Sequence, residues 1–222
     1  MKAPPRPLIA DDAGTAAHVW WRNGRLYDVK GNTWTTNGTV PMVARSGKTP
    51  AGAGSFSDAN YYSLGAGNDA LDFAGDCTIV CVFLAPASVA NQPVFFANGD
   101  GSAATGYFGH LNATGNLRFG YAPSLALATA NAQVAGAVNV ACIGYGGGQT
   151  RAKLNLGAMA SSTVAHWAAA TTVAAQLGRY TSATFAFGST IYELWASSTA
   201  MTDALATSIA NRVKSKAGIT AW

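Results

Sequence analysis

The sequence predicts an all-β protein built as an antiparallel β-sandwich. Short runs rich in aromatic and β-branched residues alternate along the chain with turns rich in Gly, Asn and Asp, and this spacing is typical of sandwiches. Charged residues make up only 11% of the 222 residues, against roughly 25% in an average soluble domain. Apolar residues make up 49% and can supply a core, so we expect one folded domain rather than a disordered chain.

Residues 1–17 are predicted to form an N-terminal arm that precedes a domain of residues 18–222. The arm is rich in Pro and then in Ala and Gly, so we expect it to have no packed core of its own. Deleting the arm should therefore leave the melting temperature of the domain nearly unchanged. Neither a signal peptide nor a membrane-spanning run is apparent in the sequence.

Most of the predicted domain consists of strands joined by tight turns. The first two aromatic runs flank Asn23-Gly24, a favoured two-residue hairpin turn. Further hairpins are predicted around Thr114-Gly115-Asn116 and around the glycines of "GYGGGQT" (144–150). Single strands are predicted in "NYYSLG" (60–65), "CTIVCVFLA" (77–85) and "PVFFANGDG" (93–101). Residues 122–136 and 157–175 are rich in Ala, Ser and Thr, and we interpret them as loops with short strands.

One segment near the C-terminus, "TDALATSIANRVKSKAGI", has helical periodicity. Apolar residues recur in it at every fourth position, namely Leu205, Ile209, Val213 and Ala217. Thr202 is a suitable N-cap, and Gly218 suits the position that ends a helix. The pattern predicts a helix over about residues 202–217, which we expect to seal an open edge or end of the sandwich.

The three cysteines are interpreted as buried thiols in apolar strands. If residues 77–85 form a strand, Cys77 and Cys81 lie roughly 13 Å apart, which is too far for a disulfide between them. Any disulfide would have to use Cys142, and its pairing with Cys77 or with Cys81 stays open.

Glu193 is the only glutamate in the chain and the natural candidate for a catalytic acid. Strand alternation predicts that Ile191, Glu193 and Trp195 share one face. A glycosidase places two carboxylates about 5–10 Å apart across one sugar, and no second acid lies two or four residues from Glu193. We therefore predict that Glu193 is a structural hydrogen-bond acceptor, that no residue is catalytic and that the protein is not an enzyme.

The basic charge is concentrated in the N-terminal part of the chain. Residues 1–50 carry seven basic and three acidic side chains, whereas the remaining 172 residues carry seven of each. The sequence contains no run of basic residues interleaved with aromatics, the pattern that is typical of nucleic-acid binding. We therefore expect docking onto an acidic protein surface. The candidate docking residues are Arg6, Arg22, Arg25, Arg45 and Lys48.

The order of several segments resembles the laminin G-like, or concanavalin A-like, jelly-roll domains. The segments that carry the resemblance are "FSDANYYSLG" (56–65), "LDFAGDCTIVCVF" (71–83), "NVACIGYGGGQTRAKLNLG" (139–157) and "FAFGSTIYELWASSTAMTD" (185–203). The resemblance covers about residues 18–219. It implies a concanavalin A-like jelly roll and places Glu193 at a glutamate that is frequent in a strand of the family. The resemblance is the only reason to consider calcium as a cofactor. Leu156-Gly157 stands where the family usually has Asn-Gly, which weakens the case for a calcium or sugar site. We predict no cofactor.

The terminal segment "NRVKSKAGI" resembles that of family members encoded in bacteriophage genomes as fibre, tail or head-accessory proteins. This resemblance implies a non-enzymatic structural protein of the virion, a decoration or appendage domain. It would dock through its N-terminal region onto capsid or tail proteins, or onto further copies of itself.

The alternative function is a carbohydrate-binding module, or a fibre domain that recognises a receptor glycan. Such a site needs exposed aromatic side chains. The candidate glycan-facing residues are Trp20, Trp21 and Trp34, although aromatic residues in strands more often belong to the core.

Overall fold

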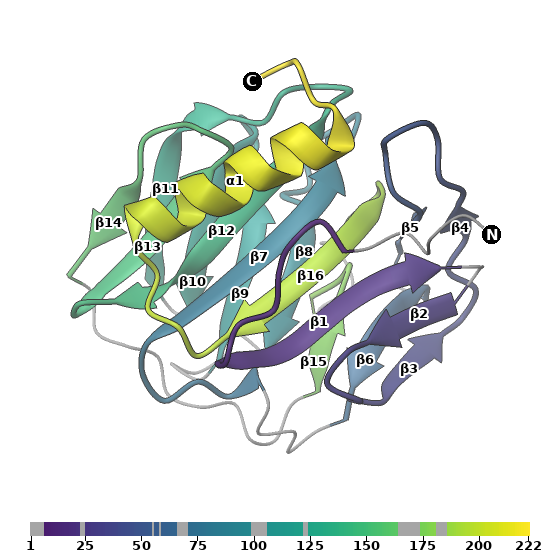
Figure 1. The fold of residues 1–222 in the computed structure, drawn as a ribbon, viewed down its shortest axis with the longest axis horizontal. Helices are drawn as coiled ribbons and strands as arrows, with labels where there is room; N and C mark the ends of the chain where they lie inside the picture. Colours follow the sequence, from purple (N-terminus) through teal and green to yellow (C-terminus); the bar gives the residue numbers. More distant parts are fainter. Residues whose placement is uncertain are drawn as a thin grey trace.

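The structure, a computed structural model, consists of two antiparallel β-sheets packed face to face, with one helix lying across the outer face of the first sheet (Figure 1). The predicted fold class is confirmed. The residues that it describes are 7–22, 25–54, 56–57, 59–65, 71–98, 106–121, 124–163, 174–180 and 186–222.

The first sheet, sheet A, carries the N-terminal strand next to the C-terminal one. Its strand order is β14 (Ala160–Ser162), β13 (Gln149–Leu154), β12 (Val138–Gly146), β7 (Cys77–Leu84), β16 (Ile191–Ser197), β1 (Thr15–Arg22) and β2 (Arg25–Asp28). Two short strands, β4 (Met42–Val43) and β5 (Gly52–Ala53), extend this sheet where β5 pairs with β16. The predicted first hairpin is confirmed by the pairing of β1 with β2, although Asn23-Gly24 itself lies outside the described residues.

The second sheet, sheet B, contains a long strand that the sequence did not predict. Its order is β11 (Ser124–Ala132), β10 (Asn116–Tyr121), β9 (Tyr107–Leu111), β8 (Val94–Asn98), β15 (Ala175–Leu177), β6 (Tyr61–Leu64) and β3 (Trp34–Asn37). The interpretation of residues 122–136 as loops with short strands is only partly right, because β11 is a strand of nine residues that pairs with β10 along the edge of the sheet. Its small Ala, Ser and Thr side chains give a weak strand signal, and the neighbouring strand decides its conformation.

The core between the sheets is filled mainly by large side chains from both. Phe83 of sheet A stacks on Phe95 of sheet B, with ring centroids 6.0 Å apart. Phe187 meets both rings edge to face. Interlocking aromatic rings of this kind contribute burial and a preferred geometry at the same time, so they fix the spacing of the two sheets.

The cysteines are free thiols, as predicted. Cys77 and Cys81 point into the core between the sheets, whereas Cys142 belongs to the apolar cluster on the outer face of sheet A. The sheet itself therefore separates Cys142 from the other two sulfur atoms. Burial raises the pKa of Cys77 and of Cys142 to about 12, so these thiols are unreactive at neutral pH.

Helix α1 (Asp203–Ala217) has the predicted caps. The Thr202 hydroxyl accepts a hydrogen bond from the Leu205 backbone N–H, and Gly218 ends the helix in the left-handed conformation. Its predicted location was wrong, because α1 covers the outer face of sheet A rather than an edge or end (Figure 1). The outward side chains of β7 and β12 are apolar, including Val80, Val82, Val138, Val140 and Cys142. Strands that are apolar on both faces need a covering layer on each side.

The buried face of α1 provides the first prediction. Ile209→Ala should lower the free energy of unfolding by about 2–5 kcal/mol, because Ile209 packs into this outer cluster and its truncation leaves a cavity. Leu205 is only partly buried against the cluster, so Leu205→Ala is the matched control and should cost less. Equilibrium unfolding in urea measures both values. Equal losses at the two positions would contradict this packing.

Candidate functional site

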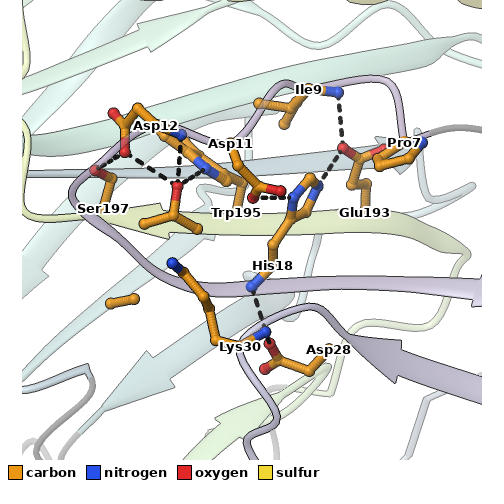
Figure 2. Close-up of polar contacts among 12 residues, drawn as sticks. Pro7, Ile9, Asp11, Asp12, His18, Asp28, Lys30, Glu193, Trp195 and Ser197 are labelled. Atoms are coloured by element: carbon orange, nitrogen blue, oxygen red, sulfur yellow. Dashed lines mark hydrogen bonds and ion pairs between the residues drawn. The ribbon is translucent and has the colours of Figure 1, made fainter.

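Glu193 lies on the outer face of sheet A, beneath the N-terminal segment. The backbone N–H groups of Leu8 and Ile9 donate to its two carboxylate oxygens at 2.7 and 2.8 Å. Figure 2 shows the bond from Ile9. The residue is only 1% exposed. Its carboxylate is therefore fully occupied and closed to a substrate, which agrees with the predicted structural role.

The predicted grouping of side chains around Glu193 is partly wrong. Glu193 and Trp195 do lie on the outer face, but Ile191 belongs to the core between the sheets with Leu194. The pairing of β16 with β7 shifts register between Ile191 and Glu193. Such a bulge adds a residue to one strand and reverses the side-chain alternation there.

His18 of β1 lies between two carboxylates. Its Nε2 is 2.8 Å from Glu193 Oε1, and its Nδ1 is 2.7 Å from Asp11 Oδ1 (Figure 2). When the ring is protonated, both nitrogens donate, one to each carboxylate. Burial lowers the pKa of His18, but hydrogen bonds and charges of Glu193 and Asp11 raise it more, and the pKa lies above the ordinary value of 6.5.

Asp12 fastens the start of β1 to the end of β16. Its carboxylate accepts hydrogen bonds from the hydroxyls of Thr15, Ser197 and Thr199. Burial alone would raise the pKa of Asp12, but these three hydrogen bonds hold the pKa below its ordinary value. The Trp195 indole Nε1–H donates to the same Thr15 hydroxyl, so the cluster is continuous with the strand that carries Glu193.

Residues 7–12, which we call the N-terminal strap, pack on their own domain. Leu8 and Ile9 are buried in the cluster beneath α1. Two cations of the helix hold the strap, because Arg212 donates to the Leu8 carbonyl and Lys216 to the Pro7 carbonyl. The expectation of an unpacked arm is therefore wrong for these residues, and residues 15–17 already belong to β1.

The three candidate tryptophans have different surroundings. Trp21 is only 2% exposed in the core between the sheets, so its predicted role as a glycan-facing residue is wrong. Trp34 is partly buried against that core, and its Nε1–H donates to Asp28 Oδ2 at 2.9 Å. Trp20 points to the outer face of sheet A, where it packs edge to face on His18.

The half-buried Trp20 adjoins an exposed apolar surface formed by β2 and the residue after it. Its cross-strand partner is Tyr27, and the two rings stack at 6.3 Å with 22° between their planes. Tyr27 is 41% exposed and Val29 is 48% exposed. Val29 adjoins His18, since its N–H donates to the His18 carbonyl. We call Trp20, Tyr27 and Val29 the aromatic patch.

The predicted docking cations fall into two groups. Arg22 and Arg25 lie opposite one another at the end of the β1–β2 hairpin. Arg45 and Lys48 lie in the loop between β4 and β5, where they line a pocket beside the strap. Arg6 lies outside the described residues. Arg212 and Lys216, which the sequence predicted only to favour the dipole at the helix end, line the same pocket.

The described residues contain no group of three or more His, Cys, Asp or Glu side chains that could hold a metal ion. In the same part of the chain, no helix is both long and apolar enough to cross a membrane.

Neither the family profiles nor the curated protein sequences compared with this chain contain a match. Solved structures do share its fold. Domain 4 of AbnA, an extracellular GH43 arabinanase from Geobacillus stearothermophilus solved with arabinotriose, aligns at a TM-score of 0.65 and 18% identity, over 90% of this chain and 100% of its own. Botulinum neurotoxin type C, whose cell entry depends on interaction with two ganglioside molecules, aligns at a TM-score of 0.63 and 9% identity.

The sialidase of Trypanosoma rangeli, solved with 2,3-difluoro-KDN, aligns at a TM-score of 0.63 and 11% identity over 92% of this chain. This chain spans 51% of the neurotoxin chain and 33% of the sialidase chain. The predicted bacteriophage origin stays a prediction. At these identities the likeness establishes architecture alone, and the chain has the jelly-roll β-sandwich fold that these proteins contain.

Proposed function

We propose that this protein is a non-catalytic recognition domain that binds a glycan on the aromatic patch of β1 and β2. The observation that carries the proposal is the stack of the half-buried Trp20 ring on the exposed Tyr27 ring. A sugar ring presents an apolar C–H face that packs on such rings, while its hydroxyl groups remain available to neighbouring polar side chains. Exposed apolar patches on a folded domain commonly mark interaction sites.

The distribution of exposed apolar side chains supports this location. Among the described residues, three large apolar side chains are exposed, and two of them, Tyr27 and Val29, belong to the patch. The third is Leu156. The patch is therefore a concentration of apolar surface rather than part of an evenly apolar exterior.

The neighbours in fold support the class of ligand. One was solved with arabinotriose, one is described by its interaction with gangliosides, and one was solved with a sugar-acid analogue. Several of the neighbours are described as binding domains. The sealed carboxylate of Glu193 supports a role without catalysis. A reducing-sugar assay tests the competing function of a glycan hydrolase, and measurable turnover would contradict our proposal.

The proposal predicts which side chains a ligand needs. A glycan array identifies the ligand, and isothermal titration then compares variants. Trp20→Ala and Tyr27→Ala should each weaken binding about tenfold or more, since aromatic anchors at binding sites cost roughly 2 kcal/mol or more when truncated. Leu156→Ala, which removes an exposed apolar side chain elsewhere, is the control and should bind as the parent does. Unchanged affinity in both aromatic variants would refute this site.

Attachment to a virus particle is the setting that the sequence resemblance implies, and it stays a prediction. The strap is bound to its own domain, and exposed cations such as Arg25 and Lys48 are available for docking onto particle proteins. Co-sedimentation of the chain with assembled particles is the test. A protein that is found only free in solution would contradict this setting.

A further inference from the structure

A pocket of about 560 Å³ lies between the N-terminal strap, the β4–β5 loop and the C-terminal half of α1. Its volume is in the range of roughly 300–1,000 Å³ that is usual for small-molecule sites. It is lined by residues 7–11 of the strap, by Arg45, Lys48 and Pro50 of the loop, and by Arg212 and Lys216 of the helix. None of them belongs to the aromatic patch, so the pocket is a separate surface.

The pocket is strongly basic. Four of its side chains are cationic and a single one, Asp11, is acidic. The Asp11 carboxylate is already bound to the His18 ring. Within the described part of the chain, Arg45, Lys48 and Arg212 have no carboxylate within 4.0 Å. The end of α1 adds about half a negative charge, which is much less than the excess of positive charge.

The cations are held in place by three separate segments. The Arg212 Nε–H donates to the Leu8 carbonyl and the Arg45 Nε–H to the Gly47 carbonyl, at 2.9 and 3.1 Å. Each guanidinium keeps its terminal N–H groups, which suit a carboxylate, sulfate or phosphate. Lys48 packs on the helix end, since a Cβ placed on Gly218 would lie 2.8 Å from Lys48 Cδ.

We propose that this pocket binds a small anionic ligand, of about disaccharide size, through a carboxylate, sulfate or phosphate group. The cations neutralise the acidic group, and the apolar strap residues and Pro50 offer a surface for the rest of the ligand. A concave site of this volume selects a small molecule rather than the flat acidic surface of another protein. The proposal rests on residues other than the aromatic patch and is independent of glycan binding there.

Isothermal titration at low ionic strength tests the site with three probes. Inorganic phosphate and sialyllactose carry an anionic group, and lactose is the neutral counterpart of sialyllactose. We expect the anionic probes to bind and their affinity to fall as NaCl is added, because salt screens an exposed charged pocket. Binding of phosphate as tight as that of sialyllactose assigns the pocket to the anionic group alone, whereas tighter sialyllactose binding assigns it to an acidic sugar. Lactose binding equal to that of sialyllactose would overturn the proposal, as would no binding of either anion.

A pair of double variants locates the binding. Arg45→Gln with Lys48→Gln should weaken anion binding at least tenfold and leave the melting temperature unchanged, because both side chains are exposed and neither holds the strap. Arg25→Gln with Lys30→Gln removes the same amount of charge from the β1–β2 hairpin and should have no effect on anion binding. Loss of anion binding in the second variant alone would move the site to the hairpin and refute the pocket, while glycan binding at the aromatic patch would stand.

Discussion

Glu193→Gln should lower the free energy of unfolding by about 3–5 kcal/mol, the usual loss when one partner of a buried charged pair is removed. The carboxylate accepts from the N–H groups of Leu8 and Ile9 and from the His18 ring. A glutamine turns an N–H₂ group toward at least one of these donors, so one donor is left buried and unsatisfied. Urea unfolding at neutral pH measures the loss.

Asp11→Asn is the matched control, because both carboxylates face the same imidazole. The side chain of Asp11 is 42% exposed and that of Glu193 is 1% exposed. Because the Asp11 carboxylate lies partly in solvent, water weakens its pairing with the buried His18 ring, so the Asn variant should lose less stability. Similar losses in the two variants would mean that burial of Glu193 does not determine its contribution.

The pH dependence of stability should change in the Glu193→Gln variant. The pKa of His18 is raised in the folded state above its ordinary value of 6.5. The folded protein therefore holds this proton more tightly than the unfolded chain does. The resulting stabilisation is fully present below about pH 6.5 and is lost as the pH rises through the folded pKa. The variant, which lacks the Glu193 charge, should show a smaller loss over this interval.

A chain that begins at Ala13 should be less stable by about 3–6 kcal/mol. The truncation removes Leu8 and Ile9, and each buried aliphatic side chain contributes roughly 1.5–3 kcal/mol. It also removes both backbone donors of Glu193 and the carboxylates of Asp11 and Asp12. Thermal unfolding followed by circular dichroism should show a clearly lower melting temperature.

The double variant Leu8→Ala with Ile9→Ala isolates the apolar contribution from the polar ones. It keeps the backbone N–H groups that bind Glu193 and removes only the apolar side chains, so it should lie between the parent and the truncated chain. A truncated chain that melts at the parent temperature would show that the strap contributes no stability, as its composition had predicted.

The features that were predictable from the sequence are local ones. Helix α1 follows from Thr202, Gly218 and a four-residue apolar period, all within one short segment. Hairpins follow from glycine turns such as Gly147-Gly148, where both residues adopt positive φ. The location of α1 on the sheet did not follow, because it depends on which strands carry apolar side chains outward.

The features that escaped prediction join distant residues. His18 meets Asp11 and Glu193, which are 7 and 175 residues away, and no spacing pattern signals such a contact. The proline and alanine residues of the N-terminal segment suggested an unpacked arm, although the segment contains the adjacent apolar residues Leu8 and Ile9. For the tryptophans, strand alternation did contain a signal. The inward series of β1 is Ala17, Val19 and Trp21, whereas His18, Trp20 and Arg22 form the outward series.

The position of β16 between β7 and β1 has a consequence for biosynthesis. His18 and its partner Glu193 are 175 residues apart, and a ribosome adding about 5–20 residues per second needs roughly 10–35 s to cover that interval. During this time the edge of β1 that later pairs with β16 has no partner strand. The residues between β1 and β16 therefore emerge while the backbone N–H and C=O groups of that edge are unpaired. The first strand to be synthesised in sheet A therefore completes its pairing only after the last one has left the ribosome.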